Sequence, residues 1–185
     1  MVCVVQRVSV VGNSGSGKSW LARRIAESIG APYVELDEIN HLAGWTTPSP
    51  EALLETVKRV TDSATWVVDG NYRAVVVEGP VWQRADTVVW VDPPRHVVMR
   101  QVVRRTLVRF VTRQELWNGN REKFVDMVEW DPNKSIIRWS WTQHHKYQAR
   151  YSSAMSSPDH AHLHFVQLRS RSEVTSWLAS LRPDQ

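Results

Sequence analysis

Gly12-Asn13-Ser14-Gly15-Ser16-Gly17-Lys18-Ser19 fits the pattern G-x-x-x-x-G-K-[ST], which is typical of a loop that binds phosphate groups. Glycines let such a loop curl so that successive backbone N–H groups point at phosphate oxygens. The ammonium of Lys18 is expected at the β- and γ-phosphates, and the hydroxyl of Ser19 can ligate Mg²⁺. We therefore expect the eight residues of this loop, together with the adjacent Trp20, to form a nucleotide site.

The sequence on both sides of this loop supports the prediction. Residues 6–11 are mostly apolar and β-branched, which predicts a buried strand. After the loop, Leu21, Ile25 and Ile29 recur at helical spacing, and Gly30 predicts the end of that helix. A strand, a loop and a helix in this order are what a phosphate loop requires, because the helix directs its positive N-terminal end at the anion.

Further β-branched apolar segments alternate with helical segments along the chain. We expect strands at residues 33–37, 65–69, 87–92 and 162–168, and helices at residues 49–63, 95–109, 136–155 and 172–181. This alternation predicts an α/β fold with a parallel sheet and helices on both faces. The sequence predicts a single domain over residues 1–185, with a lid-like insert at about residues 110–135.

Composition limits the class of protein. The chain of 185 residues is 42% hydrophobic, which is enough for a core, and most of its 10 tryptophans are expected to be packing residues. Its single cysteine, Cys3, excludes an internal disulfide and a cysteine-based zinc site, and it suits a reducing cytoplasm. No apolar run has the length of a transmembrane helix. We therefore expect a cytoplasmic protein without a membrane partner.

An aspartate ends each of three expected strands: Asp37, Asp69 and Asp92. The carboxyl ends of parallel strands line the ligand crevice, where a carboxylate can hold Mg²⁺ or orient an acceptor hydroxyl. The alternative for each is an ordinary turn residue or helix cap. We assign metal binding to Asp69 with Ser19, and catalysis and acceptor binding to Asp37. Asp92 is more typical of a turn, because two prolines follow it.

The residues after the third expected strand form a second candidate acceptor site. In Asp-Gly-Asn-Tyr, Gly70 allows a close backbone approach, and the side chains of Asn71 and Arg73 can bind an acceptor. A plain Asp-Gly turn is the alternative.

Basic residues are concentrated in one segment. From Arg95 to Phe124 there are eight Lys or Arg and two acidic residues, a local charge of +6 in a chain of net charge +4. Arginine suits phosphate because its planar fork is bidentate and always charged. We expect Arg105 and Arg109 to bind the nucleotide and Arg113 and Arg121 to act in catalysis. A solvated basic face is the alternative.

The chain resembles the small P-loop kinase-like proteins related to adenylate kinase, a group often labelled "DNA topology modulation protein". The stretches that carry the resemblance are GNSGSGKSWLARRIA (12–26), ELDEINHLAGW (35–45), WVVDGNYR (66–73), ADTVVWVDPPR (85–95), RRTLVRFVTRQELWNGNRE (104–122) and RSRS (169–172). The resemblance implies a five-stranded parallel sheet of the nucleoside monophosphate kinase type. It also implies an acceptor region after the second strand and a small helical lid after the fourth.

The resemblance implies roles for individual residues. Arg104 or Arg105 would lie near the adenine or at the lid hinge, and Arg171 would lie beside the base. The lid arginines that would close over the phosphates are Arg109, Arg113 and Arg121. The acceptor pocket would be lined by Asp37, Trp45, Asn71 and Arg73. The segment from residue 37 to residue 63 is short compared with the acceptor region of true adenylate kinases. The expected lid also lacks the four-cysteine zinc pattern of some relatives. A short acceptor region also occurs in shikimate and gluconate kinases, which favours a small hydroxylated acceptor.

Together these observations predict an ATP- and Mg²⁺-dependent kinase with a small-molecule or nucleotide acceptor. Lys18 and the lid arginines would stabilise the transferring phosphoryl group, Ser19 and Asp69 would hold Mg²⁺, and Asp37 would orient the acceptor. A nucleotide-dependent regulator that binds nucleic acid through the basic segment is less favoured, because a kinase lid also explains these arginines. An ATPase without an acceptor is a third hypothesis.

Overall fold

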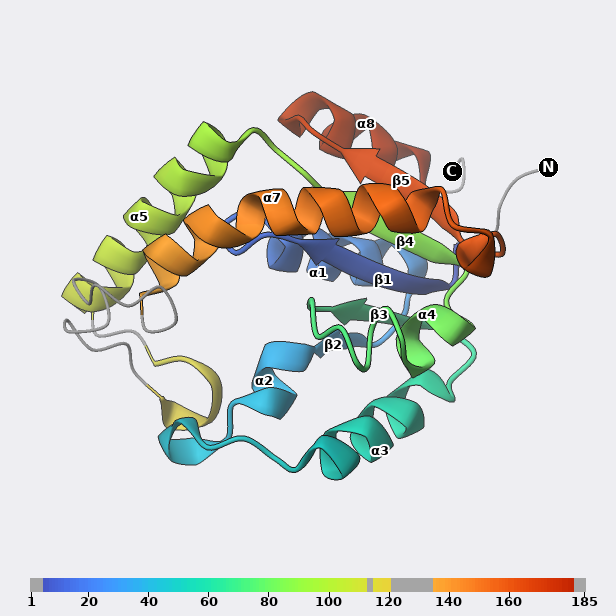
Figure 1. The fold of residues 1–185 in the computed structure, drawn as a ribbon, viewed down its shortest axis with the longest axis horizontal. Coiled ribbons are helices and arrows are strands. Elements are labelled where there is room, and N and C mark those ends of the chain that lie inside the picture. Colours follow the sequence, from blue (N-terminus) through green and yellow to red (C-terminus); the bar gives the residue numbers. More distant parts are fainter. Residues whose placement is uncertain (1–4, 113–114, 121–134, 182–185) are drawn as a thin grey trace.

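A five-stranded sheet forms the centre of the protein (Figure 1). The computed structural model describes residues 5–112, 115–120 and 135–181. The strands are β1 (Arg7–Gly12), β2 (Tyr33–Glu35), β3 (Trp66–Asp69), β4 (Thr87–Val91) and β5 (His164–Leu168). Their order is β2-β3-β1-β4-β5, and every neighbouring pair is parallel. The predicted fold class, an α/β fold with five parallel strands flanked by helices, is confirmed.

Helices cover both faces of the sheet. They are α1 (Lys18–Ile29), α2 (Leu36–Asn40), α3 (Pro50–Thr61), α4 (Pro80–Arg84), α5 (Arg95–Thr112), α7 (Ile136–Met155) and α8 (Arg171–Ser180), with short 3₁₀ turns η1 (Ala43–Trp45), η2 (Trp117–Gly119) and η3 (Pro158–His160). In Figure 1, α7 crosses the front of the sheet and α1 lies behind it. No helix in the described ranges is long and apolar enough to span a membrane.

The sheet is buried on both faces because its strands alternate apolar side chains between two cores. In β4, Val88 and Trp90 belong to the core beneath α3, α4 and α7, whereas Val89 and Val91 belong to the core beneath α1 and α8. Successive side chains of a strand point to opposite faces, so a continuous apolar run fills both layers. Packing on both faces fixes the strands in place, so that their carboxyl ends lie along one edge of the sheet.

The second expected strand was too long. β2 ends at Glu35, and Asp37 lies in the first turn of α2, not at a strand end. Leu36 is fully buried against Gly70, and the backbone N–H of His41 donates to Asp37 O at 2.9 Å. The chain therefore turns into a helix one residue after the ladder, which local strand propensity could not indicate.

Other boundaries differ less. α8 begins at Arg171 where a start at residue 172 was expected, and Ser170 caps it, because Ser170 Oγ accepts from the N–H of Glu173 at 3.2 Å. β5 begins at His164 where a start at residue 162 was expected, and α5 continues past Arg109 to Thr112. The short helix α4 was not predicted. Most of the insert expected at about residues 110–135 lies outside the described residues.

Some of the tryptophans lie in the core and others lie at the surface. Trp66, Trp82 and Trp90 are buried in the core, as expected for packing residues, whereas Trp20 and Trp141 are more than half exposed. Trp82 also donates its indole N–H to the buried hydroxyl of Ser9 at 3.1 Å.

We expect Trp82→Phe to destabilise the fold by about 1–3 kcal/mol, because the Ser9 hydroxyl then loses its donor in a buried site. Trp141→Phe, the same change at a side chain that is 51% exposed, should alter stability by less than about 0.5 kcal/mol. Urea unfolding of both variants measures the difference. Equal stabilities of the two variants would contradict the proposed importance of the buried hydrogen bond.

Candidate active site

The phosphate loop connects β1 to α1 and is enclosed by other elements. β1 ends at Gly12 and α1 begins at Lys18, as the motif predicts. Gly15 has φ +82°, and a Cβ added there would collide with Val102 of α5. Only glycine combines this backbone conformation with such a close approach, so Gly15 lets α5 lie directly against the loop.

Side chains from α7 and from the β3 end hold the loop in place. Asn13 Nδ2 donates to the carbonyl of Ser140 at 2.8 Å, and Ser140 Oγ donates to the carbonyl of Ser14 at 3.0 Å. Asn71 Oδ1 accepts from the N–H of Gly12 at 3.0 Å, and its Nδ2 donates to Gly12 O at 2.7 Å. The hydroxyl of Tyr151 donates to the same Asn71 Oδ1 at 2.9 Å. Side chains of distant segments therefore hold the loop through its backbone N–H and carbonyl groups.

Lys18 lies beside the carboxylate that ends β3. Its Nζ is 3.2 Å from Asp69 Oδ1, with 12% of the Lys18 side chain and 0% of the Asp69 side chain exposed. Burial alone lowers the pKa of Lys18, but the nearby carboxylates of Asp69 and Asp37 outweigh it and raise the pKa above its ordinary value. Lys18 is thus a permanent cation at the loop.

Tyr33 and Glu35 complete this buried cluster. The hydroxyl of Tyr33 donates to Glu35 Oε2 at 2.9 Å and lies 3.2 Å from Asp69 Oδ2. Burial and then these two carboxylates raise the pKa of Tyr33, so its hydroxyl stays neutral and remains a donor. Arg23 binds the same Glu35 Oε2 at 2.9 Å.

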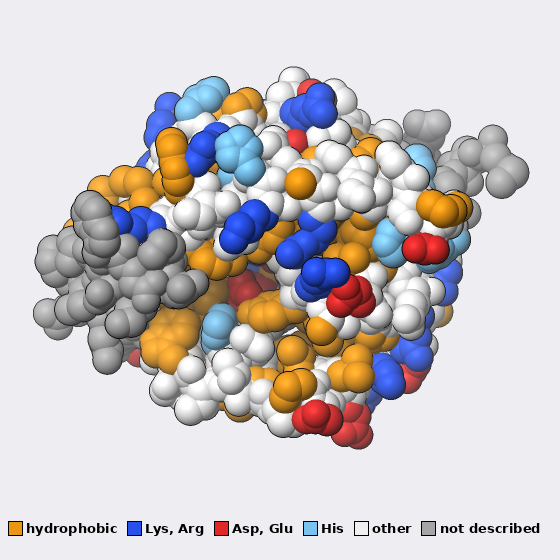
Figure 2. Space-filling model, viewed as in Figure 1, with side chains coloured by type: hydrophobic (Ala, Val, Ile, Leu, Met, Phe, Trp, Pro, Cys, Tyr) orange, Lys and Arg blue, Asp and Glu red, His pale blue; other side chains and the backbone are white. Residues whose placement is uncertain are grey.

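A cleft of about 1040 Å³ opens in front of the loop. Figure 2 shows it as a hollow whose walls carry acidic, histidine and hydrophobic side chains. Its lining includes residues of the phosphate loop, α1, α2, η1, α5, η2 and α7: Ser14, Gly15, Gly17, Lys18, Ser19, Trp20, Arg23, Glu35, Asp37, Asn40, His41, Trp45, Asn71, Tyr72, Gln101, Arg105, Thr106, Arg109, Leu116, Trp117, Ile136, Trp139 and Tyr147.

The α5 side of the cleft is basic and touches the loop. Arg105 donates to Ser14 Oγ at 2.8 Å, and Arg109 follows one helical turn later on the same face. Together with Lys18, these guanidinium groups make this side suited to a polyphosphate. Two further arginines expected here, Arg113 and Arg121, lie outside the described residues.

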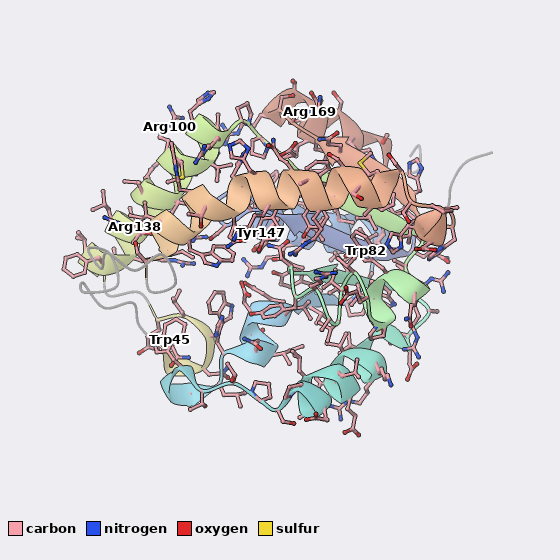
Figure 3. The ribbon with its side chains drawn as sticks, in the orientation of Figure 1. Trp45, Trp82, Arg100, Arg138, Tyr147 and Arg169 are labelled. Carbon is pink, nitrogen blue, oxygen red and sulfur yellow. The ribbon has the colours of Figure 1, made fainter. Side chains whose placement is uncertain are left out.

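The opposite side of the cleft is acidic and aromatic. The hydroxyl of Tyr72 donates to Asp37 Oδ1 at 2.9 Å, and burial followed by the Asp37 charge raises the pKa of Tyr72. The ring of His41 lies between two indoles, 5.5 Å from Trp45 and 5.6 Å from Trp117 between centroids. In Figure 3, Trp45 and Tyr147 stand on opposite sides of the space in front of the sheet.

Two asparagines fasten η2 onto the segment after α2. Asn118 Nδ2 donates to the carbonyl of His41 at 2.7 Å, and Asn120 Nδ2 donates to the carbonyl of Leu42 at 2.9 Å. Asn120 Oδ1 also accepts from the N–H of Trp45 at 3.0 Å, and the asparagine is only 5% exposed. This contact closes one end of the cleft.

Asn120→Ala should loosen this end of the cleft, because it removes both side-chain bonds of a nearly buried amide. We expect faster amide hydrogen exchange in residues 42–46 and 115–120, by about tenfold for a loss of roughly 1.4 kcal/mol. Exchange in α1 is the internal control and should not change. An unchanged rate at residues 42–46 would contradict a fastening role for Asn120.

Two residues expected in the site do not line the cleft. Arg73 forms an ion pair with Glu78 and is 64% exposed, Arg171 lies at the start of α8, and neither is among the described residues that line the cleft. Asp92 accepts from the side-chain amides of Gln148 and Gln167. Asp92 is thus a structural residue, as its prolines suggested. The turn that follows Tyr72 brings Arg73 to this local partner, and acceptor binding by Arg73 stays a prediction.

Several aromatic residues in or beside the cleft were not predicted. Tyr147, which lines the cleft, and the buried Tyr151 share one face of α7 with Ser140, at spacings of seven and four residues. That mixed polar and aromatic face could have indicated a helix that lines a site. No local signal pointed to His41, whose ring neighbours Trp45 and Trp117 come from η1 and η2.

The fold is similar to that of solved kinases. A shikimate kinase from Bacteroides thetaiotaomicron has a TM-score of 0.58 and 13% identity, covering 96% of this chain and 96% of that chain. Shikimate kinase from Acinetobacter baumannii, in complex with shikimate, has a TM-score of 0.54 and 16% identity, covering 97% and 92%. Neither a family model nor a curated protein matches the sequence. The comparison therefore establishes a P-loop kinase fold, and the narrower "topology modulation" resemblance stays a prediction.

Proposed function

We propose that this protein is an ATP-dependent kinase that phosphorylates a hydroxyl group of a small molecule. The observation that carries the proposal is the polarity of the cleft. Its α5 side presents Lys18, Arg105 and the phosphate loop, whereas its α2 side presents Asp37 beside Tyr72. A polyphosphate donor fits the first side, and a hydroxyl to be deprotonated fits the second.

In the proposed reaction the acceptor hydroxyl oxygen forms a bond to the γ-phosphorus of ATP. The bond from that phosphorus to the β–γ bridging oxygen breaks, ADP leaves, and the hydroxyl proton passes to the Asp37 carboxylate. Tyr72 orients that carboxylate by donating to Asp37 Oδ1. Lys18 moves from Asp69 to the phosphates and stabilises their charge.

The residues near the loop also fit Mg²⁺. This ion prefers oxygen ligands and is often held by one or two carboxylates together with substrate phosphates. Ser19 lines the cleft at the start of α1, and the Asp69 carboxylate is buried at the end of β3. We assign Ser19 and Asp69 to the metal, which when bound neutralises charge on the β- and γ-phosphates.

A phosphotransfer screen tests the proposal. The protein is incubated with Mg-ATP and nucleosides, nucleoside monophosphates, and small polyols and hydroxy acids, and products are identified by mass. We expect one class of acceptor to yield a product heavier by one phosphoryl group, with ADP formed in equal amount. ADP released at the same rate with and without every acceptor would favour the ATPase hypothesis and contradict a kinase.

DNA-binding measurements on the same protein test the nucleic-acid hypothesis. Binding to duplex or single-stranded DNA that weakens steeply with salt would favour a regulator that uses the basic segment. Under the kinase proposal, DNA should not compete with ATP.

A further inference from the structure

The charges that line the cleft are separated, and this separation restricts the acceptor. Among the described lining residues the cations are Lys18, Arg23, Arg105 and Arg109. Arg105 binds the phosphate loop and Arg109 follows it on α5, while Lys18 lies beside Asp69 at the loop. These three belong to the donor side. Arg23, the remaining cation, is bound to Glu35.

On the acceptor side the described charged groups are the carboxylates of Asp37 and Glu35 and the guanidinium of Arg23, which is paired with Glu35. Asp37 lines the cleft and is bound by Tyr72, and Glu35 lines it with one oxygen shared by Arg23 and Tyr33. A phosphate or carboxylate on the acceptor would approach Asp37 with a like charge. In a partly desolvated cleft such a pair is repulsive and is not screened as it is in water.

Much of the remaining cleft lining is aromatic. The ring of His41 contacts Trp45 and Trp117, and on the α7 side Trp139 and Tyr147 form an edge contact at 6.0 Å. Trp45 is 39% exposed, although large aromatics are usually buried. Indole faces that line a cleft are suited to stacking on a flat, π-bonded ring.

From this arrangement we propose that the acceptor is a nucleoside: a hydroxyl-bearing molecule with a flat ring and no anionic group. The inference rests on the proposed kinase function and specifies its substrate class. The base would stack against Trp117 and its aromatic neighbours, and a sugar hydroxyl would reach Asp37. The nucleoside monophosphates used by adenylate kinase relatives, and small hydroxy acids, would be poor acceptors.

Binding measurements test the ligand class separately from catalysis. Calorimetric titrations use the full chain saturated with a non-transferable ATP analogue and Mg²⁺. The ligands are the common nucleosides, their 5′-monophosphates, shikimate and gluconate. We expect at least one nucleoside to bind at least tenfold more tightly than its monophosphate and than either acid. Tighter binding of a monophosphate or an acid, or no binding of any nucleoside, would overturn the inference.

Two variants test the physical cause of the preference. Trp117→Ala should weaken nucleoside binding by about tenfold or more, the usual effect of removing one stacking partner. Trp141→Ala, at an exposed position of α7 outside the cleft lining, should not weaken it.

Asp37→Asn should reduce the preference for nucleoside over monophosphate by about tenfold because the repelling charge is gone. Asp159→Asn on η3 should leave the preference unchanged. An unaltered preference in Asp37→Asn would contradict the electrostatic argument.

Transfer assays with the same ligands separate the two proposals. Phosphorylation of a hydroxy acid or a monophosphate in preference to nucleosides would overturn the nucleoside inference and leave the kinase function standing. Nucleosides that bind but yield no phosphorylated product, with no other acceptor phosphorylated, would overturn both the kinase function and the acceptor role of the aromatic side.

Discussion

Lys18→Ala is expected to lower the rate of phosphoryl transfer about 10³-fold or more, because the cation that meets the β- and γ-phosphates is lost. Lys58→Ala, on the exposed face of α3, is the matched control and should retain the wild-type rate. The measurement is acceptor-dependent ADP formation, together with calorimetric ATP binding. Retention of both ATP affinity and transfer in Lys18→Ala would contradict the proposed donor site.

The same substitution should also destabilise the protein. It leaves the fully buried Asp69 carboxylate without the ammonium at 3.2 Å, and breaking a buried pair in this way costs about 3–5 kcal/mol. Adding Asp69→Asn removes the uncompensated charge, so Lys18→Ala/Asp69→Asn should recover most of the stability in urea unfolding. Its transfer activity should remain lost. Recovery of activity along with stability would mean that Lys18 acts only on the fold.

Asp37→Asn is expected to reduce kcat by about 10²–10⁴-fold, the usual contribution of a general base. ATP affinity should change little, because Asp37 lies on the acceptor side of the cleft. The amide oxygen can still accept from the Tyr72 hydroxyl, so the substitution removes the basic group and preserves the local geometry. Single-turnover transfer rates and ATP binding measure the two effects separately.

Tyr72→Phe distinguishes positioning from proton transfer. It removes the donor to Asp37 but keeps the carboxylate, so the loss of kcat should be about tenfold, well below that of Asp37→Asn. Equal losses in the two variants would mean that the hydrogen bond, not the base, limits the reaction. A loss below tenfold in Asp37→Asn would contradict the assignment of Asp37.

The fold was predictable because its signals are local. The phosphate loop needs eight consecutive residues, and the periods of strands and helices can be recognised in short windows. The helix expected from residue 49 begins at Pro50, where the Ser49 hydroxyl caps it by accepting from the N–H of Ala52 at 3.2 Å. Predictions failed where a distant contact redirected the chain, as at Leu36, which packs against Gly70 and ends β2 early.

The candidate site was predictable in part. Lys18, Ser19 and Asp69 come together because the phosphate loop and the end of β3 share one edge of a parallel sheet, and Asp37 joins them from the first turn of α2. Asn71 was expected at the acceptor. Although it lines the cleft, its polar groups bind Gly12 and Tyr151. A side-chain amide suits either role, and the sequence carries no information on which partner lies within reach.

The phosphate loop, the alternation of strands and helices, and the concentration of basic residues after β4 can all be recognised in the sequence. Each depends on neighbours in the chain and on repeat periods. The way in which the cleft is closed and divided depends instead on tertiary contacts. The bond from Asn13 to Ser140 joins residues 127 positions apart, and that from Asn120 to Leu42 joins residues 78 positions apart. Such contacts depend on how the packed sheet brings distant segments together, which no local pattern specifies.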